Sequence, residues 1–153
     1  MSDKEKSAEL ILKLYDLRRE ETMRKARNWF GGFNPESAQD IINAVRGEQS
    51  AYYRMVTTYW DMACSLVSHG AIDEEMFNDA NAEHFFIFAK IQPFIEELRA
   101  TVGSQYLPHL EKIVMRWPDA EKRLAHMREM SKKMADARAA AEAGKAQADS
   151  ANA

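Results

Sequence analysis

Apolar side chains recur at steps of three and four residues along most of this chain, which is the spacing of amphipathic α-helices. The first such stretch predicts a helix over about residues 7–30. The Gly pair at 31–32 predicts its end. Asn34, followed by Pro, predicts the N-cap of a short second helix that runs to about Arg46, because an Asn side chain accepts a free backbone N–H and Pro lacks one.

A long central helix is predicted over residues 48–68, after a break at Gly47. Its polar positions form one stripe, whereas most of the remaining circumference is apolar and rich in aromatic residues. We therefore expect the other helices to surround it almost completely. Gly70 predicts its end, since Gly readily takes the left-handed conformation at a C-cap. The polar stripe consists of Arg54, Thr57, Thr58, Asp61, Ser65 and Ser68.

The next helix is predicted to start at Asp73, whose side chain is a good N-cap and is followed by two acids in the first turn. The apolar spacing continues to Leu98. Pro93 removes a backbone hydrogen bond, so it either kinks this helix or opens a new segment.

After a turn at Gly103-Ser104, a short helix is predicted over residues 106–117, and a last helix starts around Asp119. From residue 135 onward Ala dominates, which favours helix but offers little apolar area to bury. We expect one helical domain over residues 1–143 and a frayed or disordered Ala-rich tail over 144–153. No stretch alternates like a half-buried strand. The predicted fold class is all-α, an irregular bundle of about six helices.

Composition narrows the function classes. The 153 residues are 46% apolar with six Gly and four Pro, which is typical of a globular chain. A net charge of −3 exerts no general attraction on nucleic acid or anionic lipid. One Cys forms no internal disulfide, and no apolar stretch is long enough for a signal peptide or a membrane span. We expect a cytoplasmic protein without membrane contact.

Three segments resemble an uncharacterised bacterial family of all-helical domains of unknown function. They are Tyr59-Trp60-Asp61-Met62, the run over residues 66–77 with its Ile-Asp-Glu-Glu helix start, and the Pro-containing run over residues 90–99. The resemblance extends over about residues 48–117. It implies a helical fold and no known activity, cofactor or catalytic residue.

Two groups of residues in the sequence could bind a metal or act in catalysis. Asp79 and Glu83 would share a face of one continuous helix beside His84, but no Glu-x-x-His pattern accompanies them, so we predict no metal site. Cys64 and His69 are five residues apart, a spacing that turns the two side chains away from each other on a helix. We therefore predict no catalytic residue and no cofactor.

Asp61 lies between Trp60 and Met62 in the apolar central helix. A buried carboxyl group there would have a raised pKa and suggest a general base. Its neighbours on the polar stripe favour an exposed side chain, or one paired with a polar group of another helix. Arg99 is a candidate partner, although sequence establishes no contact.

Five cations gather near the aromatic residues Trp29, Phe30 and Phe33, as in some surfaces that bind nucleic acid. Acidic neighbours dilute this patch, and it wraps around its helix. A weak nucleic-acid binder is therefore the third alternative. The cations are Arg18, Arg19, Arg24, Lys25 and Arg27.

The leading hypothesis is a non-catalytic interaction or scaffold module. It would bind a protein partner or a second copy of itself through an apolar face of the last helix, formed by Leu124, Met127, Met130 and Met134. The alternative is a bundle that binds a small ligand or a metal. Its pocket would lie among Tyr52, Tyr59, Trp60, His84 and Phe88.

Overall fold

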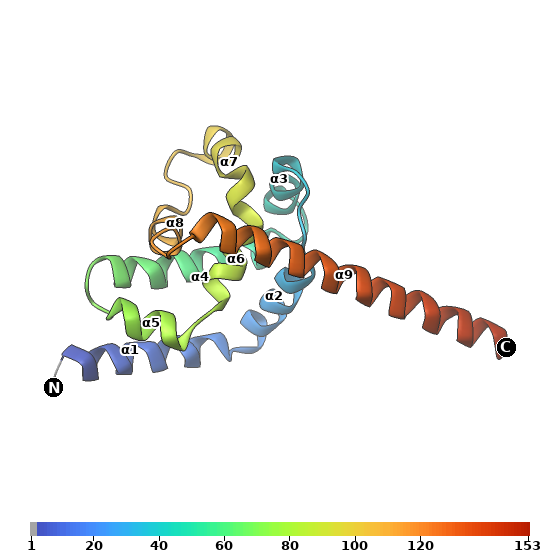
Figure 1. Cartoon of the computed structure of the whole chain (residues 1–153), viewed down its shortest axis with the longest axis horizontal. Helices are drawn as coiled ribbons and strands as arrows, with labels where there is room; N and C mark the ends of the chain where they lie inside the picture. Colours follow the sequence, from blue (N-terminus) through green and yellow to red (C-terminus); the bar gives the residue numbers. More distant parts are fainter. Residues whose placement is uncertain (1–2) are drawn as a thin grey trace.

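The computed structural model describes residues 3–153, and every regular element in that range is a helix (Figure 1). The predicted all-α fold is confirmed. The helices are nevertheless more numerous than the six or so expected, because two predicted helices are divided. In chain order the elements are α1 (Asp3–Arg18), α2 (Glu21–Gly32), α3 (Ala38–Arg46), α4 (Ser50–Ser68), α5 (Glu74–Ala80), α6 (Glu83–Ile91), the 3-10 helix η1 (Gln92–Phe94), α7 (Ile95–Val102), α8 (Pro108–Val114) and α9 (Ala120–Ala151).

The helix expected over residues 7–30 divides into α1 and α2 at Glu20. The Glu20 carboxylate accepts hydrogen bonds from the backbone N–H groups of Thr22, at 3.0 Å, and Met23, at 2.8 Å. These bonds lower the pKa of Glu20 and satisfy donors that the first turn of a helix leaves free. Glu20, which was expected to lie inside one continuous helix, is thus the N-cap of α2.

The start of α3 also differs from the prediction. Ser37 is the N-cap, and its hydroxyl accepts a hydrogen bond from the N–H of Asp40 at 3.2 Å. Asn34 instead donates to the carbonyl of Gly32 at 3.4 Å. The predicted end of the helix at Arg46 is confirmed.

The stretch that follows Asp73 forms three α-helices. Asp73 caps α5 as predicted, since its carboxylate accepts the N–H of Met76 at 2.9 Å. The division that sequence missed lies at Asn81, whose side-chain amide donates to the carbonyl of Phe77 at 3.0 Å and closes α5. Pro93 lies in η1, which separates α6 from α7, so it opens a new segment.

The central helix α4 lies where it was predicted, packed against α2, α8, α3 and α5. Its apolar side is deeply buried, with Val56, Trp60 and Ala63 excluded from solvent. The polar stripe is interrupted by Thr57, which is buried and donates its hydroxyl to the carbonyl of Tyr53 at 2.9 Å. Gly70 ends the segment at φ +79°, as predicted.

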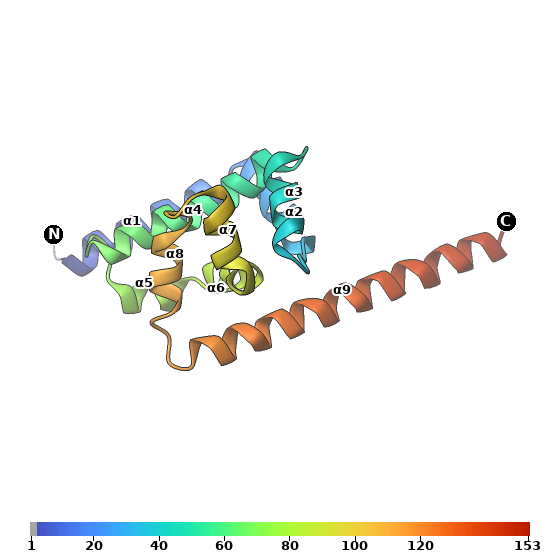
Figure 2. The same ribbon diagram turned by 90° about the horizontal axis from the view of Figure 1, so that it is seen from above.

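The last helix α9 lies against α6 at its N-terminal end and then extends away from the other helices (Figures 1 and 2). Leu124 is fully buried in the core. The helix continues past Gly144 to Ala151, through the segment expected to fray. Opening of these last turns in solution stays a prediction.

Candidate functional site

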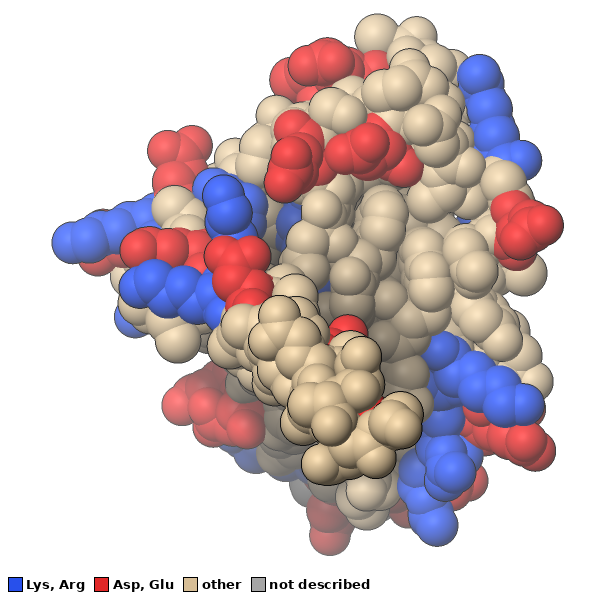
Figure 3. Space-filling model, turned by 90° about the vertical axis from the view of Figure 1, so that its right-hand side faces the viewer, with Lys and Arg blue, Asp and Glu red and all other residues tan. Residues whose placement is uncertain are grey.

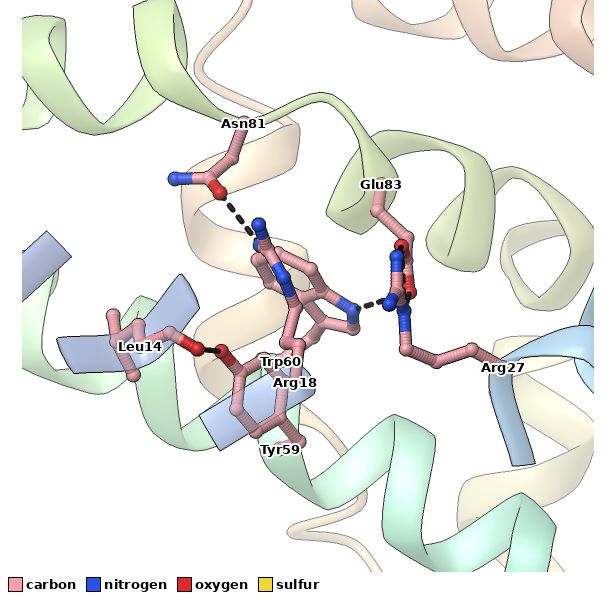
Figure 4. A network of polar contacts seen from close by, with 7 residues as sticks. All are labelled: Leu14, Arg18, Arg27, Tyr59, Trp60, Asn81 and Glu83. Atoms are coloured by element: carbon pink, nitrogen blue, oxygen red, sulfur yellow. Dashed lines mark hydrogen bonds and ion pairs between the residues drawn. The ribbon is translucent and has the colours of Figure 1, made fainter. Parts of the chain in front are cut away.

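A network of polar contacts surrounds Trp60 at the meeting point of α1, α2, α4 and α6 (Figure 4). The buried indole N–H donates to the carboxylate of Glu83 at 3.2 Å. The Nε and Nη2 atoms of Arg27 bind the same carboxylate at 3.0 and 2.6 Å. This hydrogen bonding raises the pKa of Arg27 and ties three helices together.

Arg18, the last residue of α1, completes this network (Figure 4). Its guanidinium group lies over the Trp60 ring, 5.0 Å from the centroid, and Nη1 donates to the Asn81 side chain at 2.7 Å. The hydroxyl of Tyr59, in α4, donates to the carbonyl of Leu14, which lies in α1 like Arg18. Burial raises the pKa of Tyr59 to about 12. Arg18 and Tyr59 therefore anchor the end of α1 to the core.

His84 lies fully buried between aromatic rings, with its ring centroid 5.5 Å from that of Trp60 and 4.1 Å from that of Phe85. Its Nε2 atom is 3.1 Å from Oδ1 of Asn78. Burial, together with the charge of Arg18, lowers the pKa of His84 to about 3. The imidazole is therefore neutral at pH 7, with Nε2 as the donor to Asn78.

The residues proposed to form a pocket do not share one environment. Trp60, His84 and Phe88 are fully buried in the core, whereas Tyr52 and Tyr59 are half-buried. Tyr59 lines a shallow surface groove of about 790 Å³ between α1, α2 and α4. Binding of a ligand among the five residues stays a prediction.

The expected shared face of Asp79 and Glu83 is absent, because α5 ends between them and Glu83 begins α6. Glu83 is bound by Arg27 and Trp60. Within residues 3–153 no three His, Cys, Asp or Glu side chains group closely enough to hold a metal ion. Burial also raises the pKa of the Cys64 thiol, which disfavours a thiolate nucleophile.

Asp61 pairs with another helix, but its partner is backbone. Its Oδ1 accepts hydrogen bonds from the N–H groups of His109, at 3.0 Å, and Leu110, at 2.9 Å. Asp61 thus caps the start of α8 from a distant part of the sequence. The candidate partner Arg99 instead forms an ion pair with Glu111 at 3.1 Å, so that suggestion was wrong.

The sequence did not predict the role of Lys90, which is buried and caps the C-terminal end of α2. Its ammonium group donates to the carbonyls of Phe30, Gly31 and Phe33 at 2.9, 3.1 and 2.8 Å. Burial lowers the pKa of Lys90 to about 8. The available signal was a single cation within the apolar run of α6, which is unusual unless it has partners.

The cations of the predicted basic patch are mostly engaged. Arg27 binds Glu83, Arg19 lies 3.5 Å from Asp16, and Lys25 lies 3.3 Å from Glu21. Because these neighbours offset the positive charge, the patch is a poor match for a phosphate backbone.

The predicted face of α9 is partly buried and partly open. Leu124 packs in the core and leaves no surface for a partner, which corrects the prediction for this residue. Met127 is half-buried, whereas Met130 is 42% exposed and Met134 is 62% exposed. The accessible face therefore begins near Met127 and continues along the extended part of the helix.

Three grooves border this helix, and two of them are lined by Met134 or Met127. One, of about 230 Å³, lies between the Gly31-Gly32 end of α2 and the side of α9 that carries Met134 and Arg138. The other, of about 540 Å³, lies at the start of α9, and its lining residues are Trp117, Asp119, Lys122, Arg123, His126 and Met127. Seen from the side toward which α9 points, the end of the helix presents mostly uncharged atoms (Figure 3).

A family model described as a domain of unknown function, DUF4760, matches residues 6–117. The chain belongs to the DUF4760 family. The match includes α2 to α8 and most of α1, whereas α9 lies outside it. No curated protein and no solved structure matches this DUF4760 chain. Among residues 3–153, none of the helices combines the length and apolar character needed to cross a membrane.

Proposed function

We propose that this DUF4760 chain is a non-catalytic interaction module. In this proposal the helices of residues 6–117 form a rigid body, and α9 presents an apolar face to a protein partner. The supporting observation is the position of α9, which extends away from the other helices (Figure 2). Met130 and Met134 are exposed on this helix. Exposed Met side chains adapt to the shape of a partner surface.

The chemistry of the interior supports the same proposal. The buried titratable groups have structural roles. His84 is neutral, Cys64 is a buried thiol, and Lys90 binds the carbonyl groups at the end of α2. A cytoplasmic location stays a prediction from sequence.

The test is site-specific photo-crosslinking in cells that express the full chain. A photoreactive residue replaces Met134, and a matched control replaces Ala146, which lies about 120° around the axis of α9 from Met134. We expect a protein adduct at Met134 and none at Ala146. Absence of any adduct at Met134, in a chain that still folds, would refute the proposed interaction face.

A further inference from the structure

The exposed face of α9 has the spacing of a coiled-coil seam. Apolar or small residues alternate at steps of three and four residues along it, which gives an average period of 3.5. The eight positions are Met127, Met130, Met134, Ala137, Ala141, Gly144, Ala148 and Ala151. The three Met side chains all lie in the first half of this seam, and the second half contains only Ala and Gly.

We propose that the partner is a second copy of this chain, and that the two α9 helices pair antiparallel along this seam. The inference rests on the proposed function, because it names the occupant of the same face. Antiparallel pairing places Met127 opposite Ala151 of the second copy, Met130 opposite Ala148 and Met134 opposite Gly144. The overlap is 25 residues, a length of about 37 Å.

Side-chain volume favours the antiparallel arrangement. No layer then contains two large side chains, because each Met faces Ala or Gly and Ala137 faces Ala141. Parallel pairing would place Met130 against Met130 at one end and Gly144 against Gly144 at the other. Those layers differ in thickness and would force the helices apart at the Met end.

Gly144 is an independent observation in favour of a close neighbour from outside the chain. A Cβ atom at this position would meet no atom within 4 Å, so the fold of a single chain does not require Gly there. Gly within a helix costs about 1 kcal/mol relative to Ala. The antiparallel register supplies a reason for it, since Met134 of the second copy would lie against the helix backbone at this point.

Charge is complementary in the same arrangement. Within the overlap, residues 127–138 carry four Lys and Arg against two Asp and Glu, whereas residues 139–151 carry one Lys against two acids. Antiparallel pairing places each segment beside the opposite one. It also brings the carbonyl end of the second α9, which is the negative end of the helix dipole, to the groove at Trp117 that Lys122 and Arg123 line.

Disulfide cross-linking of the full chain tests the arrangement. Met130→Cys and Ala148→Cys proteins are purified separately, one of them isotope-labelled, and are mixed under mild oxidation. We expect a mixed disulfide between the two variants and no disulfide within either variant alone. Cys64 is fully buried, and the unsubstituted chain controls for its reaction. Ala143→Cys, on another side of α9, is the matched control for Ala148→Cys.

Light scattering of the unsubstituted chain across a wide concentration range accompanies this test, and we expect the molar mass to rise toward that of a dimer. A disulfide within Met130→Cys alone would establish a parallel pair and overturn the antiparallel arrangement. A monomer at every concentration, together with a photo-adduct to a different protein at Met134, would show that the partner is not a second copy of this chain. The proposed function would still hold. Absence of both dimer and adduct would overturn both.

Discussion

At the scale of single residues, the polar side chains of the interior mainly bind the free backbone groups of helix ends or pair with side chains of neighbouring helices. Asp61 caps α8, Lys90 closes α2, and Glu83 joins Arg27 to Trp60. Each of these groups is satisfied by donors or acceptors that lie far away in the sequence. Single substitutions can test how much each of these contacts contributes to stability.

The neutral state of His84 predicts how stability depends on pH. The unfolded chain takes up a proton on this residue below pH 6.5, whereas the folded chain does so only near pH 3. Because the unfolded state binds more protons in this interval, the free energy of unfolding should fall as the pH falls from 6.5 toward 3, by up to about 1.4 kcal/mol per pH unit.

Urea unfolding followed by Trp fluorescence at a series of pH values measures this effect. His84→Gln should remove most of that slope relative to the unsubstituted chain. The exposed His126→Gln should leave the slope in place. An identical pH dependence in both variants would show that His84 does not remain neutral in the folded protein.

Asp61→Ala should destabilise the protein by about 1 kcal/mol, the usual effect of losing an N-cap, because two N–H groups of α8 lose their acceptor. Asp61→Asn keeps a side-chain oxygen and should cost less. Equilibrium unfolding in urea measures both variants. Equal stability of Asp61→Ala and the unsubstituted chain would contradict the capping role.

At the scale of helices, the ends are decided by capping and the lengths by packing. Glu20 and Asn81 end or start helices within stretches whose apolar spacing is continuous. A carboxylate or an amide that satisfies the free groups of a helix end stabilises a break, provided that the two resulting helices pack well at a new angle. The helix α9 is the opposite case, since its second half is helical although its residues from 136 onward are exposed.

Gly144→Leu distinguishes the helix content of α9 from its proposed association. Leu is a better helix former than Gly by about 0.8 kcal/mol, so circular dichroism should show equal or higher helix content. Association should weaken, because the new side chain would collide with Met134 of a second copy. Light scattering measures the loss of dimer, and Gly144→Ala is the control with the smallest added volume. Stronger association of Gly144→Leu would contradict the proposed register.

At the scale of the whole molecule, the protein consists of a helical body and one helix that extends from it (Figure 1). The DUF4760 match and the core both lie almost entirely in the body, and Leu124 is the last core residue of α9. The proposed association therefore uses a part of the chain that lies outside most of the core.

Truncation tests this division. A chain that ends at Ala135 keeps Leu124 and Met127, so its free energy of unfolding should stay within about 0.5 kcal/mol of the full chain. Its association should be lost. A chain that ends at Arg123 removes Leu124 from the core and should be destabilised by several kcal/mol. Thermal unfolding and light scattering measure both chains, and a large loss of stability in the longer one would contradict the division.

Sequence alone determined the helical class, the central position of α4, the caps at Asp73 and Gly70, and the membership of an uncharacterised family. Those properties depend on periodicity and on local turn chemistry, which are visible over a few residues. Only the tertiary structure decided that Leu124 is buried while Met134 is exposed, that Asp61 caps α8, and that Lys90 closes α2. These outcomes depend on which helices meet, because a polar side chain takes whichever partner packing brings within hydrogen-bond distance.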